Sequence, residues 1–421
     1  MEYKKFNYKS YNIYTVKTDR FKTCTIEVIF RKPLIKEEYT KDLFISSILT
    51  ECNKGIKNIK EMNEYCEELY NLNLYSTTDK VGKTLFTSFG IDFLNPKYCE
   101  SKTLDLQLKL LFDCILNPRI NNDEFDKENF EKIKVRAINS INSIEEKQPK
   151  YAIIKLLENI DKNSAASISP DGYLKDLDKI NTQNLYDYYK TFISECTCDI
   201  CIIGNLNMEE VAQKISKLFT FRTINNSEFE YIEELKARKQ VKKIIEKKDT
   251  LQSKLYLAYN LVGLDEQEKN ITMHVLNSIF GAGSLDTILG KVVRQENNLC
   301  YSVSSSYMKR QALLIVRADI DKKKSAKVTT LVKKCLKMIQ DGKFTEDDIN
   351  SAVLSIKTSL KLSIDSKENI FNNYVFNVYE NLPLLEERLN LFDNVTKEDI
   401  ITVAKKIKLN IIYLLGGDGN E

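Results

Sequence analysis

The sequence of 421 residues contains a single histidine, His274. A catalytic zinc site usually takes three protein ligands from His, Glu, Asp or Cys and leaves one position for water. No second ligand stands at helical spacing from His274, and the surrounding ITMHVLNSIF has the apolar positions of a core helix. We therefore predict that His274 lies on the flank of a buried helix and not on a metal ion. A Ser–His or Cys–His catalytic pair would also depend on this one histidine.

Long apolar runs are missing as well. No stretch approaches the ~18 residues of a membrane span, and the first residues, MEYKKFNYKSYNIYTV, lack the apolar core of a signal peptide. Neither a GxSxG elbow nor a Walker phosphate-binding loop occurs. The charges nearly balance, with 63 Lys and Arg against 60 Asp and Glu, so there is no electrostatic case for nucleic acid. These absences predict a protein with neither a membrane span nor a nucleic-acid partner.

The composition that remains is typical of a soluble globular protein, with 43% hydrophobic and 29% charged residues. The length suits two to four domains. Ten cysteines without a signal peptide predict reduced thiols in the cytoplasm. In the cluster CTCDIC, a strand would place Cys196 and Cys198 on one face and Cys201 on the other. No second cluster supplies a fourth ligand, so we favour buried thiols over a metal site.

The chain looks internally duplicated, because two stretches share one pattern: NTQNLYDYYKTFISECTCDICIIGNLN at 181–207 and NVTKEDIITVAKKIKLNIIYLLGGDGN at 394–420. Each has a threonine before a helical pattern, Thr182 or Thr396, which could cap the helix. Each helix precedes an apolar run rich in β-formers that ends in glycine, Gly204 or Gly416. The threonines are 214 residues apart and the glycines 212, and such a near-constant offset indicates a repeat.

Other elements also fit two mixed halves. IEVIF and TLFTSFGIDF predict strands in the first half, and KLYLAYNL and ALLIVRADI predict strands in the second. Long helical patterns follow in each half, and the second has Thr345 and Asp348 at the spacing of a capping box. Between the halves lies the polar stretch FRTINNSEFEYIEELKARKQ. The sequence predicts two α/β domains that meet near residue 230.

Arg294 and Tyr301 are the strongest candidates for a functional pair. SLDTILGKVVRQ predicts a helix and LCYSVSSSY a strand, so the two side chains could face one cleft. Arg offers several N–H donors to a carbonyl, and a tyrosine hydroxyl can donate to a developing oxyanion. By residue type alone, a surface arginine near a helix end and a strand tyrosine half in the core are favoured over a functional pair. The preceding GAG, Gly281 to Gly283, predicts a tight turn.

This region resembles the M16 (pitrilysin/insulinase-type) metallopeptidase family, in which a glycine turn, a helix and an Arg-x6-Tyr pair occur in the C-terminal half. The stretches SPDGYLKDLDKINTQNLYDYY and FEKIKVRAINSINSIEEKQPKYA are similar to family segments too, so the resemblance covers nearly the whole chain. It implies an α+β fold of two homologous α/β-roll domains (LuxS/MPP-like metallohydrolase fold), each a mostly antiparallel sheet backed by helices. We expect residues 1–230 to form the first domain and residues 231–421 the second.

The chain departs from the family where active members carry the zinc motif HxxEH. The matching segment is SSILTECNKG, which puts Ser46 and Thr50 at the ligand positions and Leu49 at the general base. The third ligand, a glutamate in the family, falls near Asn139 or Ser140. We therefore expect this chain to bind no metal and no cofactor of its own.

Some family members divide the work between two chains, and this sequence resembles the kind that keeps only the Arg/Tyr pair, with its nearest likeness to the bacterial YmfF-like group. The resemblance implies a heterodimer with an HxxEH-bearing M16 subunit that holds zinc, acting on a peptide substrate in the cytoplasm. Arg294 and Tyr301 would take part in catalysis, and Gly281, Ala282 and Gly283 would contact the peptide. The alternative is a proteolytically inactive structural or chaperone-like scaffold.

Overall fold

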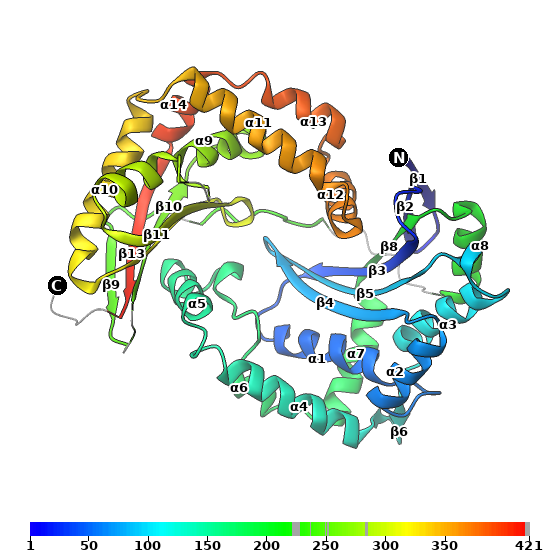
Figure 1. Ribbon diagram of the computed structural model, residues 1–421. Coiled ribbons are helices and arrows are strands. Elements are labelled where there is room, and N and C mark those ends of the chain that lie inside the picture. The colour runs from blue at the N-terminus through cyan, green and yellow to red at the C-terminus, as the bar shows by residue number, and fades with distance from the viewer. Residues whose placement is uncertain (221–227, 236, 249, 251, 283–284, 417–421) are drawn as a thin grey trace. The chain divides into compact units, whose positions relative to one another are not determined.

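The computed structural model describes residues 1–220, 228–235, 237–248, 250, 252–282 and 285–416. They form two compact units that do not follow a single cut of the chain. Unit 1 comprises Met1–Ser143, Ser169–Tyr231 and Asp365–Phe376, and unit 2 comprises Ile144–Ile168, Ile232–Ile364 and the described residues from Asn377 onward (Figure 1). The expected domain boundary near residue 230, which would separate two homologous halves of the sequence, stays a prediction. The contacts divide the chain differently, because two segments join the unit of the other half.

The described part of unit 1 has a six-stranded sheet with the order β1-β2-β8-β3-β5-β4. β8 runs parallel to β2 and antiparallel to β3, and the remaining pairs are antiparallel. The strands are β1 (Glu2–Asn7), β2 (Tyr11–Lys17), β3 (Thr23–Pro33), β4 (Asn73–Val81), β5 (Thr84–Leu94) and β8 (Thr197–Gly204), with a separate hairpin of β6 (Ile120–Asn121) and β7 (Glu124–Phe125).

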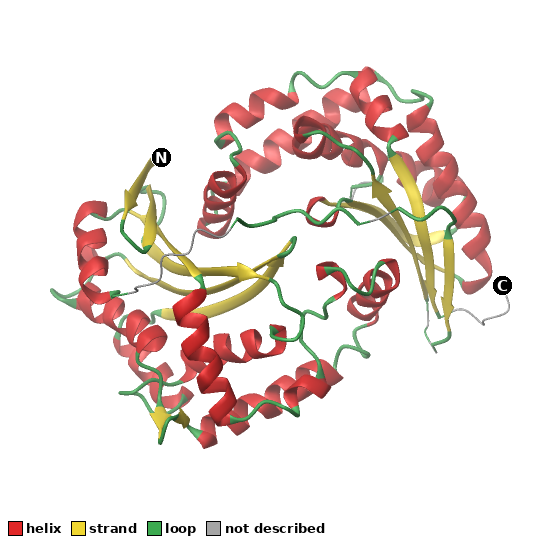
Figure 2. Ribbon diagram, turned by 180° about the vertical axis from the view of Figure 1, so that it is seen from behind, coloured by secondary structure: helices red, strands yellow, loops and turns green. Residues whose placement is uncertain are grey.

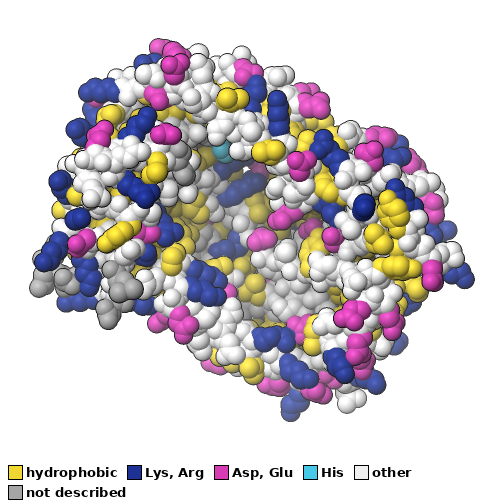
Figure 3. Space-filling view, in the orientation of Figure 1, with side chains coloured by type: hydrophobic (Ala, Val, Ile, Leu, Met, Phe, Trp, Pro, Cys, Tyr) yellow, Lys and Arg dark blue, Asp and Glu magenta, His cyan; other side chains and the backbone are white. Residues whose placement is uncertain are grey.

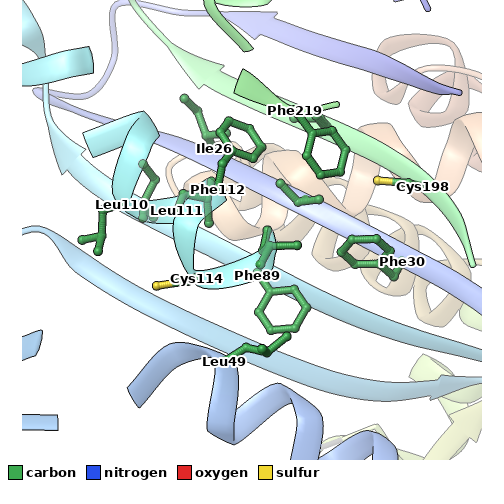
Figure 4. Close-up of a cluster of buried hydrophobic side chains, with 14 of the residues drawn as sticks. Ile26, Phe30, Leu49, Phe89, Leu110, Leu111, Phe112, Cys114, Cys198 and Phe219 are labelled. Carbon is green, nitrogen blue, oxygen red and sulfur yellow. The ribbon is translucent and has the colours of Figure 1, made fainter. Parts of the chain in front are cut away.

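Helices cover one face of this sheet (Figures 1 and 2). They are α1 (Tyr39–Glu51), α2 (Ile59–Glu68), α3 (Thr103–Leu116), α4 (Lys127–Asn142), α6 (Leu174–Leu177), α7 (Thr182–Glu195) and α8 (Met208–Leu218). Alternate residues of a strand point to opposite faces, so Ile26, Val28 and Phe30 of β3 all enter the core beneath these helices. Figure 4 shows Phe89 of β5 and Leu49 of α1 side by side in this core.

Unit 2 is built on a five-stranded sheet among its described residues, with the order β11-β12-β10-β13-β9. Its strands are β9 (Lys242–Glu246), β10 (Ser253–Leu261), β11 (Cys300–Met308), β12 (Leu313–Ile320) and β13 (Ile407–Leu415). Its helices are α5 (Gln148–Ile160), α9 (Met273–Phe280), α10 (Ser325–Gln340), α11 (Glu346–Ser363), α13 (Leu385–Phe392) and α14 (Lys397–Lys405); α12 (Lys367–Glu380) spans the boundary at Phe376.

The two sheets share one topology. In each, the last strand, β8 or β13, lies parallel to the first strand of its repeat and antiparallel to the next one. The order β2-β8-β3-β5-β4 thus matches β9-β13-β10-β12-β11 strand by strand and direction by direction. Gly204 ends β8 and Gly416 follows β13, with φ of 147° and 94°, values that favour glycine. The predicted α+β fold with two antiparallel-rich sheets is confirmed.

The exchanged segments each cover a sheet face that the other helices leave bare. Helix α5, from the first half of the chain, packs Ala152 and Leu156 against Tyr256 and Ile411 of the unit 2 sheet. In the reverse direction, the first part of α12 lies with unit 1, where Phe376 packs on Phe86 at 5.4 Å between ring centroids. Each half of the chain thus contributes one segment to the unit of the other half. A duplicated chain would show this exchange if both halves kept the same packing of that segment.

Local signals at the helix ends were predicted well, with one error. Thr345 and Thr396 each form a capping box, in which the threonine hydroxyl accepts a hydrogen bond from the backbone N–H three residues on and the aspartate carboxylate there accepts one from the threonine backbone N–H. Thr182 does not cap α7. Asn181 does, one residue earlier, with its side chain accepting from the backbone N–H of Asn184. The correction reflects the equal or better capping strength of asparagine.

The surface shows no segregation of charge on the face drawn in Figure 3, where basic and acidic side chains alternate. The helices of the described ranges are all too short or too polar to span a bilayer.

Candidate functional site

Arg294 and Tyr301 both lie in unit 2 and both are exposed. Arg294 is on a helical segment, Gly290–Glu296, and Tyr301 is the second residue of β11, the edge strand of the sheet. The Tyr301 side chain is 63% exposed, and no hydrogen bond or ion pair joins either side chain to another described residue. The expectation of a half-buried tyrosine is therefore wrong, and the ring contributes little to the core.

Tyr301 occupies a β-bulge. Cys300 pairs with Ile320 and Ser302 pairs with Asp319, so Tyr301 between them has no partner on β12. A bulge bends a strand and turns the side chain of the extra residue in a new direction, and bulges are frequent beside active sites. The sequence pattern LCYSVSSSY predicts an ordinary strand and carries no signal of this irregularity.

The segment with Arg294 is π-helical and not the ordinary helix that SLDTILGKVVRQ predicts. Gly290 lies against Leu285, whose carbonyl oxygen would be only 2.5 Å from a Cβ added to the glycine. This close approach, which only glycine permits, accompanies the wider helical turn. Short π-helical stretches are rare and often lie at functional sites. Both members of the candidate pair thus stand on irregular backbone.

The glycine turn fixes the end of α9 to the edge strand. The Gly281 carbonyl accepts a hydrogen bond of 2.8 Å from the Ser305 N–H, and an added Cβ would lie 2.5 Å from Leu289 Cδ1. Gly281 is buried and Ala282 is exposed. Gly283, the third residue expected to contact peptide, is outside the described residues. The local geometry explains Gly281 by packing and leaves Ala282 as the accessible one of the two described turn residues.

The positions that correspond to the zinc motif lie on α1 and do not suit a metal. Leu49 is fully buried in the unit 1 core. The Ser46 hydroxyl donates to the Leu43 carbonyl at 2.8 Å, and the Thr50 hydroxyl donates to the Ser46 and Ser47 carbonyls at 3.2 and 3.1 Å. Neutral hydroxyls that donate to their own helix are poor zinc ligands beside His, Cys or carboxylate groups.

The structure brings α1 and α4 together as the resemblance implies, yet the family's zinc-ligand positions carry serine, threonine and asparagine. Ser46 and Ser140 line the same cavity, of about 370 Å³, and Ser140 donates to Asp171 at 2.8 Å. The two helices are linked by an ion pair between Glu51 and Arg136. Asn139, the alternative third position, is exposed and is not among the residues of this cavity. Across the described ranges, no three His, Cys, Asp or Glu side chains gather as a metal site would need.

His274 and the cysteine cluster have the structural roles predicted for them. His274 projects from α9 at the flank of the buried Val275 and Ile279, with its ring edge-on to Tyr307 at 5.2 Å. Cys196, Cys198 and Cys201 are all buried and free. Burial raises the pKa of Cys198 and Cys201 well above the ordinary value, so both thiols stay protonated.

Sequence reasoning missed a second polar region. A cavity of about 540 Å³ lies in unit 1, on the sheet face opposite α1, with Glu27 of β3 and Tyr75 of β4 among its residues. The available signal was the charged Glu27 inside the apolar strand IEVIF.

Fold and site together define a two-unit α+β protein with an exposed Arg/Tyr pair and without ligands at the zinc positions. A family model described as "Peptidase M16 inactive domain" matches residues 179–355. The chain is 26% identical over 410 residues to "Probable inactive metalloprotease YmfF" of Bacillus subtilis (strain 168), with 96% of this chain and 95% of that protein covered.

Solved structures show the same similarity over the whole chain. A conserved protein from Enterococcus faecalis V583 superposes with a TM-score of 0.91 at 25% identity, covering 100% of this chain and 99% of that chain. A peptidase M16 inactive domain from Pseudomonas fluorescens gives 0.80 at 16% identity, with 99% and 98% covered, and shows the shared fold. The predicted resemblance to the M16 family is confirmed: the family model matches part of the chain, the chain lacks HxxEH, and it is similar to YmfF along almost its whole length.

Proposed function

We propose that this chain is the non-catalytic subunit of a two-chain M16-type zinc endopeptidase. Its partner is an HxxEH-bearing M16 protein, which holds the zinc and supplies the activated water. The observation that carries the proposal is the exposure of Arg294 and Tyr301 on two irregular backbone segments, with no partner for either side chain among the described residues. A large aromatic side chain that only served the fold would be expected to bury its ring.

Each side chain has a distinct role in this proposal. The Tyr301 hydroxyl donates a hydrogen bond to the oxyanion that forms when water adds to the scissile carbonyl, an interaction strongest in the transition state. The Arg294 guanidinium donates to a backbone carbonyl of the substrate in both the ground state and the transition state. Ala282, an exposed residue of the glycine turn, contacts the peptide beside them.

The substrate class and compartment follow the same reasoning. We assign the complex to peptide processing or turnover in the cytoplasm. Ten free cysteines, nine of them buried, fit a reducing compartment. The alternative function, a proteolytically inactive scaffold, would need neither a zinc-bearing partner nor a substrate.

Substituting Tyr301 tests catalysis in trans. Tyr301→Phe removes one exposed hydroxyl and should leave folding and assembly intact. Loss of a single oxyanion donor costs about 10²–10³ in kcat. The measurement is kcat and KM for the complex reconstituted with the HxxEH-bearing M16 partner, with assembly followed by size-exclusion chromatography. Tyr98→Phe is the matched control, because Tyr98 is 50% exposed and lies in unit 1.

Arg294→Ala should lower kcat/KM and raise KM, because its contact stabilises bound substrate as well as the transition state. Lys291→Ala on the same helical segment is the control, since it removes an exposed cation one turn away. If both pair variants assemble and cleave like the wild-type chain, the pair is unused and the scaffold function replaces this proposal. If they fail to assemble, the residues belong to the subunit interface and the assigned roles are wrong.

A further inference from the structure

The sheet of unit 1 has a second face, which carries polar residues where the first face carries the core. Thr25, Glu27 and Ile29 alternate with the core residues of β3 and line the cavity of about 540 Å³. β4 and β5 supply one side of this cavity, and Ser366 with residues of α12 up to Phe376 supplies the other, all of them within unit 1. A cavity of this size lies within the range of ligand pockets.

The floor of the cavity is a buried carboxylate held in place by two hydroxyls. Glu27 is only 9% exposed. Tyr75 donates to its Oε2 at 3.1 Å, and Ser88 donates a second hydrogen bond. Glu27 and Tyr75 both pair with Gly90 of the intervening strand. An added Cβ at Gly90 would lie 2.3 Å from Tyr75 Cζ, so the missing side chain is what lets the Tyr75 ring cross β5 to reach Glu27.

The charges around this floor are unbalanced. The Lys367 ammonium group donates hydrogen bonds to Asp92 and to Thr23, so its charge is paired with Asp92. Glu27, Asp79 and Glu368 have no ion pair with a lysine or arginine in the part of the chain that the structure describes. Asp79 and Glu368 are exposed, whereas Glu27 lies deep, so the acidic groups run from the opening to the floor.

The remaining wall is aromatic. Phe371 and Phe376 of α12 line the cavity together with Phe86 of β5, which is buried. Aromatic faces attract a cation through their negative π-surfaces and pack against an aliphatic stem. An anionic floor with aromatic walls selects a ligand with a positive end and an apolar stem, and it disfavours an anion.

We propose that this cavity binds a lysine or arginine side chain of a peptide, with the cationic end against Glu27 and the stem along Phe371 and Phe376. The proposal rests on the proposed function only in taking a peptide as the source of the cation. A free alkyl amine or guanidine shares this chemistry, and the experiment separates the two sources.

The protonation of Glu27 makes this binding depend on pH. Burial raises the pKa of Glu27 to about 7, although hydrogen bonds from Ser88 and Tyr75 oppose the rise. Below that value the carboxyl is neutral and attracts no cation, so affinity should increase as pH rises from 6 to 8, with release of a proton on binding. The other ionisable groups facing Glu27 are Tyr75 and Asp79 of β4, Asp92 of β5, Cys201 of β8, and Lys367 and Glu368 of α12. Burial keeps Cys201 and Tyr75 protonated in this range.

Titration calorimetry of the intact chain, without any partner, tests the proposal. The probes are the peptide acetyl-Gly-Gly-Arg-Gly-Gly-amide, the same peptide with neutral citrulline for arginine, and agmatine as a free cation. We expect the arginine peptide to bind at pH 8 at least about ten-fold more tightly than the citrulline peptide, since a charge-assisted hydrogen bond is lost. Agmatine should bind more weakly than the arginine peptide.

Glu27→Gln should reduce the affinity for the arginine peptide about ten-fold or more and abolish the increase between pH 6 and 8. Glu131→Gln is the control, since Glu131 is an exposed carboxylate on α4 outside the cavity. Equal binding of the arginine and citrulline peptides, or an unchanged Glu27→Gln variant, overturns the proposal, and agmatine binding as tightly as the peptide overturns the peptide source. If Glu27→Gln does not fold, the wild-type pH series decides, because flat affinity from pH 6 to 8 contradicts the role of Glu27. Neither Arg294, Tyr301 nor a zinc-bearing chain enters this measurement, so its failure and that of the proposed function are independent.

Discussion

At the scale of single residues, Leu49 illustrates why the zinc motif cannot be judged by side-chain chemistry alone. Its replacement of a general base removes proton transfer, as the sequence indicates. The structure adds that Leu49 is fully buried beside Phe89 in the unit 1 core (Figure 4). The position has become part of the packing, so a glutamate restored there would place a carboxylate in an apolar environment at high cost.

Leu49→Ala should lower the free energy of unfolding of the chain by about 2–5 kcal/mol, because a fully buried leucine leaves a cavity when truncated. Thr50→Ala, the next residue of the same helix, should cost less than about 1 kcal/mol, since its hydroxyl only donates to carbonyls of its own helix. Urea denaturation followed by circular dichroism measures both. A Leu49→Ala loss no larger than that of Thr50→Ala would refute the role of Leu49 in the core.

At the scale of elements, the sequence predicted what depends on near neighbours and missed what depends on backbone distortion. The capping box at Thr345 was visible as a spacing, because it is closed by residues three apart, and Thr396 was visible as a helix cap. The π-helical turn at Arg294 and the bulge at Tyr301 were not visible. Both arise from packing against other elements, and the residues themselves would also fit a regular helix and strand.

The capping box of α11 should contribute to stability in a way that depends on pH. Burial alone would raise the pKa of Asp348, but hydrogen bonds from the Thr345 backbone N–H and hydroxyl outweigh it and lower the pKa. A lowered pKa stabilises the fold above the ordinary aspartate value of about 3.9, and this contribution disappears as pH falls through the lowered value. Asp348→Asn should therefore lower the melting temperature at pH 7, and the difference from wild type should shrink toward pH 3.

Thr345→Ala should cost about 0.5–2 kcal/mol at pH 7, as loss of an N-cap does. Asp347→Asn is the matched control, because Asp347 shares the first turn of the helix without closing the box. Thermal unfolding at the two pH values measures all three variants. A pH-independent effect of Asp348→Asn, or an effect of Asp347→Asn of the same size, would contradict the assignment.

At the scale of the whole molecule, the exchange of segments between the units is the main feature that sequence did not predict. The repeat was recognised from its spacing, and the matching strand orders agree with it. A cut near residue 230, however, assigns α5 to the first domain, whereas α5 packs on the sheet of unit 2. Amphipathic periodicity shows that a helix buries one face, and it does not show which sheet that face meets.

The exchange predicts that a substitution in the first half destabilises the second unit. Leu156 of α5 is fully buried against the unit 2 sheet, so Leu156→Ala should cost about 2–5 kcal/mol. Hydrogen exchange should show the loss of protection in β10 and β13 and not in β3 or β8, because exchange reports the stability of the cooperative unit to which each amide belongs.

Leu111→Ala provides the opposite case, since Leu111 of α3 is fully buried in the unit 1 core. This substitution should reduce the protection of backbone amides from hydrogen exchange in β3 and β8 first. If Leu156→Ala instead weakens the strands of unit 1, or if both variants weaken all strands equally, α5 does not belong to unit 2 as a cooperative element.

By itself the sequence indicated two mixed α/β halves, the duplication and the capping box at Thr345, because these follow from local periodicity and spacing. The resemblance to the M16 family implied the α+β class and the loss of zinc ligands. Only the tertiary structure decided which segments are exchanged, how the backbone presents Arg294 and Tyr301, and that Glu27 and Tyr75 meet across Gly90. Those features depend on strand register between distant parts of the chain. A shift of one residue would turn Glu27 into the core and Ile26 out of it, and nothing within either strand alone specifies that pairing.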